Sequence, residues 1–332
     1  MALFTNSPVR PNQQNQAGPI DALTITEFTG IVEGTLARTS KLDPFIQRRR
    51  VMGTNSLTNY AVGETQLQTL TPGVAPDGTP VSFSKLALTI DTVVLARNIF
   101  PLLETFQNSF DVRKQVGQEQ GKKIGKFTDQ AFMIAGIKVA RLTQSPYSNI
   151  AGDKPEGHEG GHIETLGAAG DALDPAALYT AIADALVKME EKDVSPQTED
   201  VMLIVRPAQF YVLQQAEQII NGEYLTSDGN KLTGVPVFKA WGIPVISSNN
   251  LPNTNIVGHP LSNANNSNGY DVDATKVVGL LISPRALLAG ETIPLTSKVF
   301  FDDLSKQWFV DSWLSFGVTG NRAEFAAVIQ IP

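Results

Sequence analysis

The feature that most constrains this chain is a helical pattern that is too long for the core of a compact domain. Between residues 102 and 142, apolar side chains recur at spacings of three and four, including Leu103, Phe106, Phe110, Ile124, Phe127, Ala131 and Ile134. A helix of roughly 38 residues would be about 57 Å long at a rise of 1.5 Å per residue. The pattern predicts a spine, or else a helix that bends or breaks.

A glycine stripe runs along the same segment. Gly117, Gly121 and Gly125 recur at every fourth residue, so one line on the helix surface would lack side chains. Each glycine lowers helix propensity by up to ~1 kcal/mol relative to alanine. The stripe therefore indicates either a weak point in the helix or a surface that another backbone approaches closely.

A long β-hairpin is predicted over residues 51–95. Its arms would be about 50–62 and 81–94, and apolar and polar residues alternate along the second arm through Leu86, Leu88 and Ile90. The turn residues of "TPGVAPDGTP" separate the arms. A hairpin alone is marginally stable in water, so this one needs a neighbour. Residues 1–20, rich in Asn, Gln and Pro, indicate a flexible arm before it.

The second half of the chain alternates helices and strands and favours an α/β domain over residues 174–290. Asp174 and Pro175 are typical of a helix start, and Leu178, Ile182, Leu186 and Met189 would form its buried face. The strand "VMLIV" (201–205), a helix from Pro207 and the strand "GIPVISSNNLP" (242–252) follow. Residues 143–173 are expected to be a surface loop, and 291–332 to be strands that pack back on the long helix.

Charge is distributed unevenly along the chain. Residues 1–150 carry a net charge of +4 and residues 151–332 a net charge of −11, which together give −7. Such an asymmetry suits head-to-tail contact between copies as well as it suits nucleic acid. An acidic chain is a poor candidate for a dedicated DNA-binding protein. The absence of cysteine excludes disulfides and thiolate chemistry, and no apolar run approaches the ~18 residues of a membrane span.

No pattern of residues supports an enzyme, a metal site or a bound cofactor. "HEGGH", from His158 to His162, has the spacing of a zinc-protease motif, but that chemistry needs a helix. Three glycines in and beside the motif argue for a loop instead. "GQEQGKK" (117–123) has the wrong spacing for a phosphate loop, and Lys122, Lys123 and Lys126 are most simply a solvated helix face.

Several stretches, in order along nearly the whole chain, resemble the major capsid proteins of short-tailed phages of the autographivirus type. These are "EFTGIVEGTLARTS" (27–40), "LTID" (88–91) with "FDVR" (110–113), "GIPVISSNNLP" (242–252) and "GVTGNRAEFAAVIQ" (317–330). The resemblance implies an α+β chain of the Hong Kong 97 phage capsid fold. Its parts would be an N-terminal arm (1–50), an extended hairpin loop (51–95), a peripheral domain with the spine helix (96–173), an axial domain (174–290) and a return to the peripheral domain (291–332).

The resemblance also implies a function and a set of partners. Copies would assemble into hexamers and pentamers of an icosahedral head, in the host bacterial cytoplasm, with scaffolding and portal proteins. Packaged double-stranded DNA would contact the inner face nonspecifically. A nanocompartment shell of the same fold and a soluble oligomeric α/β enzyme are the alternatives.

Three consecutive arginines, Arg48, Arg49 and Arg50, stand at the base of the predicted hairpin. Within an assembly they could pair with carboxylates of an adjacent subunit, form a solvated face, or contact packaged DNA. The first interpretation makes them candidates for contacts between subunits. Charged residues of the hairpin itself complete that set: Glu64, Asp77 and Lys85.

Overall fold

The computed structural model describes residues 40, 42, 44–63, 67–75, 78, 83–102, 112–147, 159–216 and 239–332. The predicted N-terminal arm lies almost entirely outside these residues. The chain separates into two compact units, which contain residues 93–127 with 293–315, and residues 41–92, 128–292 and 316–332. Helix α3 (Val112–Ala140) and strands β12 (Leu287–Asp302) and β13 (Gln307–Gly320) each run from one unit into the other.

Helix α3 is continuous over 29 residues, which corresponds to about 44 Å. It passes through Gly121 and Gly125 without a break, so the alternative of a broken helix is wrong over this span. The predicted first residues of the helix, 103–111, lie outside the described part. Lys122, Lys123 and Lys126 are exposed, as predicted for a solvated face. Residues 131–137 are buried on every side of the helix.

In the first unit, strand β4 (Val94–Pro101) pairs antiparallel with β13, from Val94 opposite Leu314 to Pro101 opposite Gln307. Val94 was predicted to belong to the hairpin's second arm, and this prediction is wrong. The hairpin ladder ends at Thr89, and four residues without strand structure separate it from β4. Because β13 offers β4 a continuous antiparallel partner, the apolar alternation resumes in a different sheet.

A buried glutamine on α3 connects the helix to this strand pair. Gln120 donates from Nε2 to the Asn98 side chain at 2.5 Å and to the Val310 carbonyl at 2.9 Å. Its Oε1 accepts from the Ser312 hydroxyl at 2.9 Å. A buried amide costs free energy unless it is hydrogen-bonded, and these three bonds satisfy it within the unit.

The second unit is built on a six-stranded sheet of order β5-β14-β11-β6-β8-β7. Its strands are β5 (His162–Thr165), β6 (Met202–Val205), β7 (Lys239–Ala240), β8 (Ile243–Ser247), β11 (Val277–Ile282) and β14 (Ala326–Gln330). Every residue of β6 and β11 is buried. Strands covered on both faces are expected to be apolar throughout rather than alternating, which explains the runs "MLIV" and "VVGLLI".

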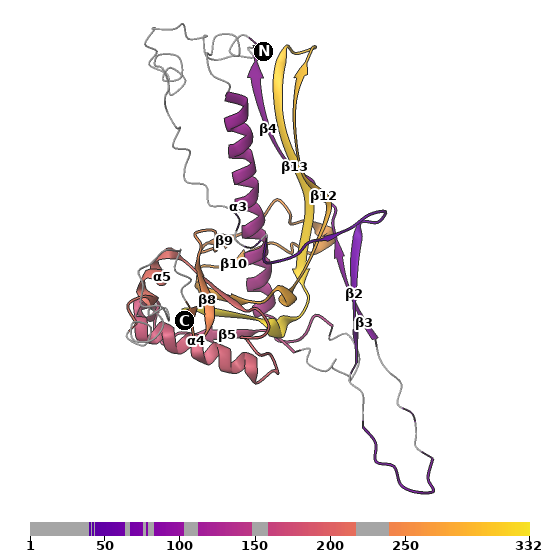
Figure 1. The fold of residues 1–332 in the computed structure, drawn as a ribbon, viewed down its shortest axis with the longest axis vertical. Helices are drawn as coiled ribbons and strands as arrows, with labels where there is room; N and C mark the ends of the chain where they lie inside the picture. The colour runs from indigo at the N-terminus through magenta and orange to yellow at the C-terminus, as the bar shows by residue number, and fades with distance from the viewer. Residues whose placement is uncertain are drawn as a thin grey trace, which may run out of the picture. The chain divides into compact units, whose positions relative to one another are not determined.

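Two helices accompany this sheet. Helix α4 (Pro175–Glu190) begins as predicted, because the Asp174 carboxylate accepts a hydrogen bond from the Ala176 amide at 3.0 Å. Its predicted buried face, Leu178, Ile182, Leu186 and Met189, is buried. The helix packs against β5 and β14, and α5 (Pro207–Leu213) begins at the predicted proline (Figure 1).

Two predicted segments differ from the structure. The segment 143–173, expected to be a loop, contains β5 and the 3₁₀ helix η1 (Ala169–Leu173). The segment 317–330, expected to be one strand, is divided by a 3₁₀ turn at 323–325, and its last part, β14, pairs with β11 and β5. The reason is the apolar run "AAVI", whose residues are all buried in the sheet. The five-part domain division stays a prediction.

The predicted hairpin arms are paired. Strands β2 (Ser56–Val62) and β3 (Phe83–Thr89) form an antiparallel ladder from Ser56 opposite Thr89 to Val62 opposite Phe83. Strand β1 (Arg49–Arg50) precedes them and pairs in parallel with β12. The remaining short elements are β9 (Asn255–Ile256), β10 (Val272–Asp273), η2 (Ala264–Asn266), η3 (Pro284–Ala286) and η4 (Ala323–Phe325).

A close approach of α3 to the six-stranded sheet occurs at a glycine that lies outside the predicted stripe. A Cβ atom at Gly136 would lie 2.9 Å from Cδ1 of Ile282 and 3.0 Å from Cδ2 of Leu280, both on β11. Such distances are shorter than ordinary van der Waals contact, so a side chain at Gly136 would force the end methyl groups of Ile282 and Leu280, both fully buried, to move. Gly136 is therefore required for packing inside the second unit.

Candidate subunit interface

The base of the hairpin is fixed to the second unit by backbone pairing and an apolar cluster. Arg49 pairs with Gly290 and Arg50 with Glu291, and the Val51 amide donates to the Glu291 carbonyl at 2.8 Å. The apolar cluster consists of Val51, Leu88, Ile90 and Leu288, with Leu57 and Leu86 packed against it. Residues of both arms thus contribute to a small core of their own chain.

The three arginines do not share one environment. Arg48 is 13% exposed in its side chain and lies 3.5 Å from the Glu291 carboxylate. Its guanidinium also stands 5.7 Å from the Phe132 ring centre and 5.3 Å from that of Phe316, within the range of a cation–π contact. Arg49 and Arg50 are exposed. Arg48 is therefore engaged inside the chain, and Arg49 and Arg50 remain the candidates for a neighbour.

The other charged candidates lie on the hairpin. Lys85 is exposed on β3, directly opposite Tyr60 of β2. Glu64 and Asp77 lie outside the described residues. Contacts of any of these residues with a second subunit stay a prediction.

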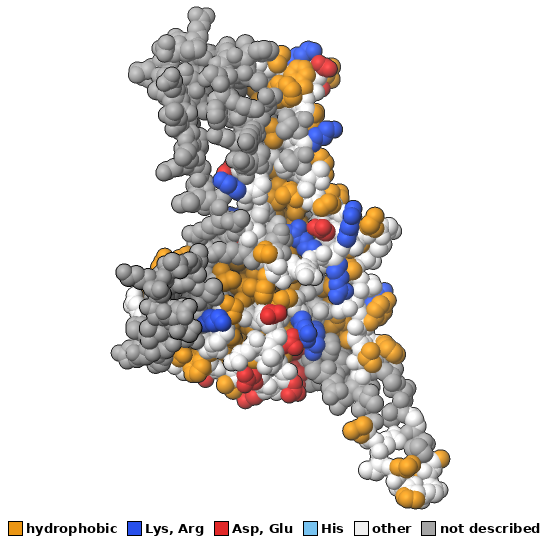
Figure 2. Space-filling model, viewed as in Figure 1, with side chains coloured by type: hydrophobic (Ala, Val, Ile, Leu, Met, Phe, Trp, Pro, Cys, Tyr) orange, Lys and Arg blue, Asp and Glu red, His pale blue; other side chains and the backbone are white. Residues whose placement is uncertain are grey.

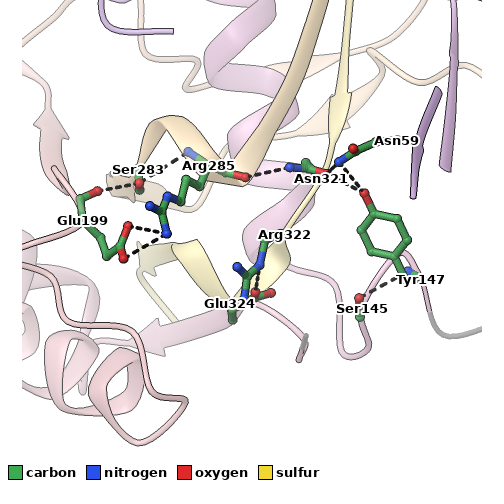
Figure 3. Close-up of polar contacts among 9 residues, drawn as sticks. All are labelled: Asn59, Ser145, Tyr147, Glu199, Ser283, Arg285, Asn321, Arg322 and Glu324. Carbon is green, nitrogen blue, oxygen red and sulfur yellow. Dashed lines mark hydrogen bonds and ion pairs between the residues drawn. The ribbon is translucent and has the colours of Figure 1, made fainter. Parts of the chain in front are cut away.

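A polar network holds the first arm of the hairpin to the body of the second unit (Figure 3). Asn59 of β2 donates from Nδ2 to the Tyr147 hydroxyl at 3.0 Å and to Oδ1 of Asn321 at 2.8 Å. The Tyr147 hydroxyl donates to the same Asn321 oxygen at 2.6 Å. Asn321 is itself fixed, because its backbone N–H donates to the Ala286 carbonyl and its side-chain Nδ2 donates to the Arg285 carbonyl. We call Asn59, Tyr147 and Asn321 the hairpin anchor.

Burial makes this anchor strong. Tyr147 is 1% exposed, and burial raises the pKa of its phenol above the usual value, so the hydroxyl keeps its proton and can donate. A buried donor that loses its acceptor costs about 1–3 kcal/mol. The three side chains therefore depend on one another.

Next to the anchor lies a buried ion pair. Nε of Arg322 is 2.5 Å from Oε1 of Glu324, whose side chain is fully buried. Burial raises the pKa of the Glu324 carboxyl, and the positive charge of Arg322 opposes that rise. The guanidinium of Arg322 also covers the Phe325 ring at 4.6 Å. A further ion pair, Arg285 with Glu199 at 2.9 Å, is partly exposed (Figure 3).

The second arm is held at its end by a separate contact. Asp91, two residues after β3, accepts hydrogen bonds from Nδ2 of Asn263 and of Asn265, each at 2.8 Å. These bonds lower the pKa of the Asp91 carboxyl below its usual value, and the bond from Asn265 has the largest effect. The segment 262–269, which contains both asparagines, thus positions the end of the hairpin.

The outer part of the hairpin presents apolar side chains to solvent. Tyr60 is 64% exposed, Val62 53% and Phe83 68%, and the strand register places Phe83 opposite Val62 and Lys85 opposite Tyr60. Leu67, Leu70 and Val74, in the segment between the strands, are 97%, 73% and 64% exposed. Figure 2 shows hydrophobic side chains along the hairpin at the lower right. We call Tyr60, Val62 and Phe83 the outer face.

The middle glycine of the stripe has open space around it within the described chain. A Cβ atom at Gly121 would meet nothing within 4 Å, and one at Gly125 would lie 3.8 Å from Cβ of Ser40. No close partner inside the described chain therefore accounts for Gly121. Gly117 also lies on α3, and the stripe as a packing surface stays a prediction.

The histidine motif has a strand where a metalloprotease would need a helix. His162 lies in β5, and its Nε2 is 3.0 Å from the Glu164 carboxylate two residues on. His158 is outside the described residues. Within the described ranges, no group of three His, Asp or Glu side chains is arranged to hold a metal ion, and no helix is long and apolar enough to cross a membrane.

Sequence reasoning missed the hairpin anchor and the Asp91 contact. Asn59, Tyr147 and Asn321 are far apart in the chain, and none belongs to a recognisable motif. The density of Asn in "SNANNSNG" was a usable signal, since Asn side chains donate and accept equally. The buried position of Arg48, between two rings and a carboxylate, left no local trace in the sequence.

The model of one protein family, described as Gp10A-like major capsid protein, matches residues 82–289, which is more than half of the chain. The chain belongs to the Gp10A-like major capsid proteins. It is a structural protein of the phage virion and not an enzyme. None of the curated proteins compared with it matches significantly.

Two solved capsid structures share the fold of this capsid protein along nearly its whole length. The capsid of cyanophage P-SCSP1u matches 99% of each chain at 20% identity, with a TM-score of 0.77. The mature capsid of bacteriophage PhiM1 matches 98% of this chain and 99% of its own, also at 20% identity, with a TM-score of 0.74. A Mycobacterium phage Che8 structure covers 83% and 84% at 14% identity, with a TM-score of 0.58. The α+β Hong Kong 97-type capsid fold is confirmed.

Proposed function

We propose that this capsid protein forms rings of six and of five copies, which close into an icosahedral head around double-stranded DNA, and that the hairpin of each copy covers a neighbour. One observation supports the proposal that the hairpin covers a neighbour. The outer face is more than half exposed at each of its three residues, while the same hairpin is anchored and packed at its base. The membership of a capsid family removes the reason to prefer a nanocompartment shell or an oligomeric enzyme.

The exposed apolar surface of the outer face favours contact with another copy. Burying a side chain such as Val or Phe stabilises a complex by about 1.5–3 kcal/mol relative to leaving it exposed. An arm that contacts a different surface on the next copy makes a heterologous interface, which closes into a ring when the rotation allows. Because each copy gives one arm and receives one, every added subunit buries another outer face.

Membership of a capsid family supports a proposal about the finer partners of the assembly. Assembly would take place in the cytoplasm of the bacterial host, together with scaffolding and portal proteins, before maturation of the procapsid. The packaged DNA would meet the inner face without sequence preference. Gly117, Gly121 and Gly125 would give a neighbouring backbone a surface of close approach, so Gly121→Leu should lower shell yield.

Electron microscopy of the purified protein tests this proposal. We expect closed shells of uniform diameter, made of rings of six and five copies, with density of a neighbouring copy over Val62 and Phe83. Shells in which the outer face contacts solvent alone would overturn the assigned role of the hairpin. Discrete small oligomers that never close would overturn the ring arrangement.

A further inference from the structure

A groove of about 910 Å³ in the second unit adjoins the hairpin base, and no role described above uses it. Its floor is apolar and buried, formed by Val201, Met202, Ile243, Leu287 and Leu288. Its rim carries the cations of Arg49, Lys239 and Arg285, all of them exposed. A buried apolar floor with a charged rim is the composition of a site for a protein segment.

The rim has a surplus of positive charge. Arg285 is paired with Glu199, whereas neither Arg49 nor Lys239 forms an ion pair with a described residue. Of the described residues that line the groove, Asp200 is the one carboxylate. A segment that brings carboxylates would therefore find two unpaired cations.

The hairpin tip, residues 63–82, is a segment of that chemistry. It contains two carboxylates, Glu64 and Asp77, and neither lysine nor arginine. Between them stand Leu67, Leu70 and Val74, which are exposed at 97%, 73% and 64%. Apolar side chains flanked by acidic ones are complementary to an apolar floor flanked by cations.

The occupant cannot be the chain's own tip in the observed conformation. Tip and groove both belong to the second unit, and Figure 1 shows the described tip residues at the far end of the hairpin, well away from β8 of the groove floor. We infer that the groove receives the hairpin tip of a second copy, with Glu64 and Asp77 facing Arg49 and Lys239. This inference rests on the proposed role of the hairpin and adds to it the surface that the tip occupies.

The three arginines would have different roles at this groove. Arg48 is held by Glu291 and two rings and supports the wall of the groove. Arg49 reaches the rim and meets the neighbour's carboxylates. Arg50, which follows it in β1, does not line the groove and adds to the positive potential nearby.

Charge reversal with matched rescue tests the inference. The double variant Arg49→Glu, Lys239→Glu should lower shell yield roughly tenfold or more, because like charges would face each other across a desolvated contact. Adding Glu64→Lys and Asp77→Lys to the same chain should restore the yield by inverting both partners. Lys276→Glu, at an exposed lysine outside the groove, is the control and should assemble as the wild type does.

A covalent test does not depend on the folding of the charge variants. The chain contains no cysteine, so a Leu70→Cys, Lys239→Cys variant can be treated with a short bis-maleimide in assembled shells. A ladder of covalently joined subunits on a denaturing gel is expected. Monomers alone after treatment would overturn the inference.

The two proposals fail in distinguishable ways. If the charge-reversed chain forms normal shells while loss of the outer face prevents assembly, the hairpin role stands and the groove is not its acceptor. If the outer face is dispensable as well, the proposed role of the hairpin fails first. A charge-reversed chain that fails to assemble and is not rescued by inversion of the tip also contradicts the inference.

Discussion

At its base, the β2–β3 hairpin is tied into its own chain, with Asn59 bonded to Tyr147 and Asn321 and with Leu88 and Ile90 buried. At its outer end, Tyr60, Val62 and Phe83 are more than half exposed. The two regions share one ladder of strand pairs, and at the outer end the face that carries Ala61 is buried whereas the face that carries Tyr60 and Val62 is exposed. The base fixes the hairpin to its own chain, and the outer face is the part that we propose a neighbouring copy covers.

One short hairpin thus combines a base whose geometry is fixed by its own chain with an apolar face that is open to another copy. A buried polar network such as the anchor favours one geometry, because any shift leaves a donor or acceptor without a partner. An exposed apolar face gains free energy only when another copy covers it. Changes at the base should therefore affect the stability of the single chain, and changes at the outer end should affect assembly.

The largest expected effect is on assembly. Replacing Tyr60 and Phe83 by Ser should reduce shell yield roughly tenfold or more, since each lost apolar contact recurs at every interface. The melting temperature of the unassembled chain should change by no more than about 2 °C, because these side chains are exposed. Val187→Ser, at a valine of α4 with 52% exposure, is the matched control. A large fall in melting temperature would contradict the division between base and outer end.

The next effect is on the stability of the single chain. Asn321→Ala removes the shared acceptor of Asn59 and Tyr147 and should lower the free energy of unfolding by about 1–3 kcal/mol, measured by urea denaturation. Tyr147→Phe, which removes one donor, should cost less, about 0.5–1.5 kcal/mol. Tyr211→Phe, at an exposed tyrosine, should be neutral. If Asn321→Ala leaves unfolding unchanged, the network does not anchor the hairpin.

Two glycines of α3 should respond in opposite directions to the same change. Gly136→Ala should destabilise the unassembled chain by about 1–3 kcal/mol, because the new methyl group collides with Ile282 and Leu280. Gly121→Ala should stabilise it by up to ~1 kcal/mol, because its Cβ meets open space. Thermal melts of both variants measure the difference. A stabilising Gly136→Ala would show that β11 yields easily to α3.

The smallest effect is a pH dependence. Because burial raises the folded-state pKa of Glu324, its contribution to stability is fully present below the unfolded-state pKa and is lost as pH rises through the folded-state pKa. Glu324→Gln lacks this titration, so the melting temperature of the variant relative to the wild type should increase from pH 4 to pH 7. The opposite trend would mean that the pairing with Arg322 outweighs burial.

The sequence predicted those parts of the fold in which hydrophobic residues recur at a regular spacing or in which a capping residue marks the start of an element. The pairing of β2 with β3, the start of α4 at Asp174 and the buried strand at 202–205 follow from alternation, capping and apolar runs. The continuity of α3 was left open, because helix propensity alone makes Gly121 and Gly125 look like weak points. Tertiary packing of its second half, where residues 131–137 are buried, overrides that local weakness.

What the sequence could not predict depends on contacts between distant residues. Asn59 and Asn321 are 262 positions apart, and no pattern in either segment identifies the other. Val94 continues the alternation of β3, so period alone assigns it to the hairpin, although its partner is Leu314. Gly136, the glycine with a packing role, belongs to no visible repeat, whereas Gly121 of the visible stripe has open space around it in the described part of the chain.

The most direct test of the central claim compares two neighbouring residues on opposite faces of β2. In a chain without cysteine, Val62→Cys and Ala61→Cys each introduce one thiol, at a position that is 53% exposed and at one that is 4% exposed. The rate of maleimide labelling is measured in unassembled chains and in closed shells. We expect Val62→Cys to react readily before assembly and to be protected in shells, with Ala61→Cys protected in both. Equal labelling of Val62→Cys in both states would contradict the claim that a neighbouring copy covers the outer face.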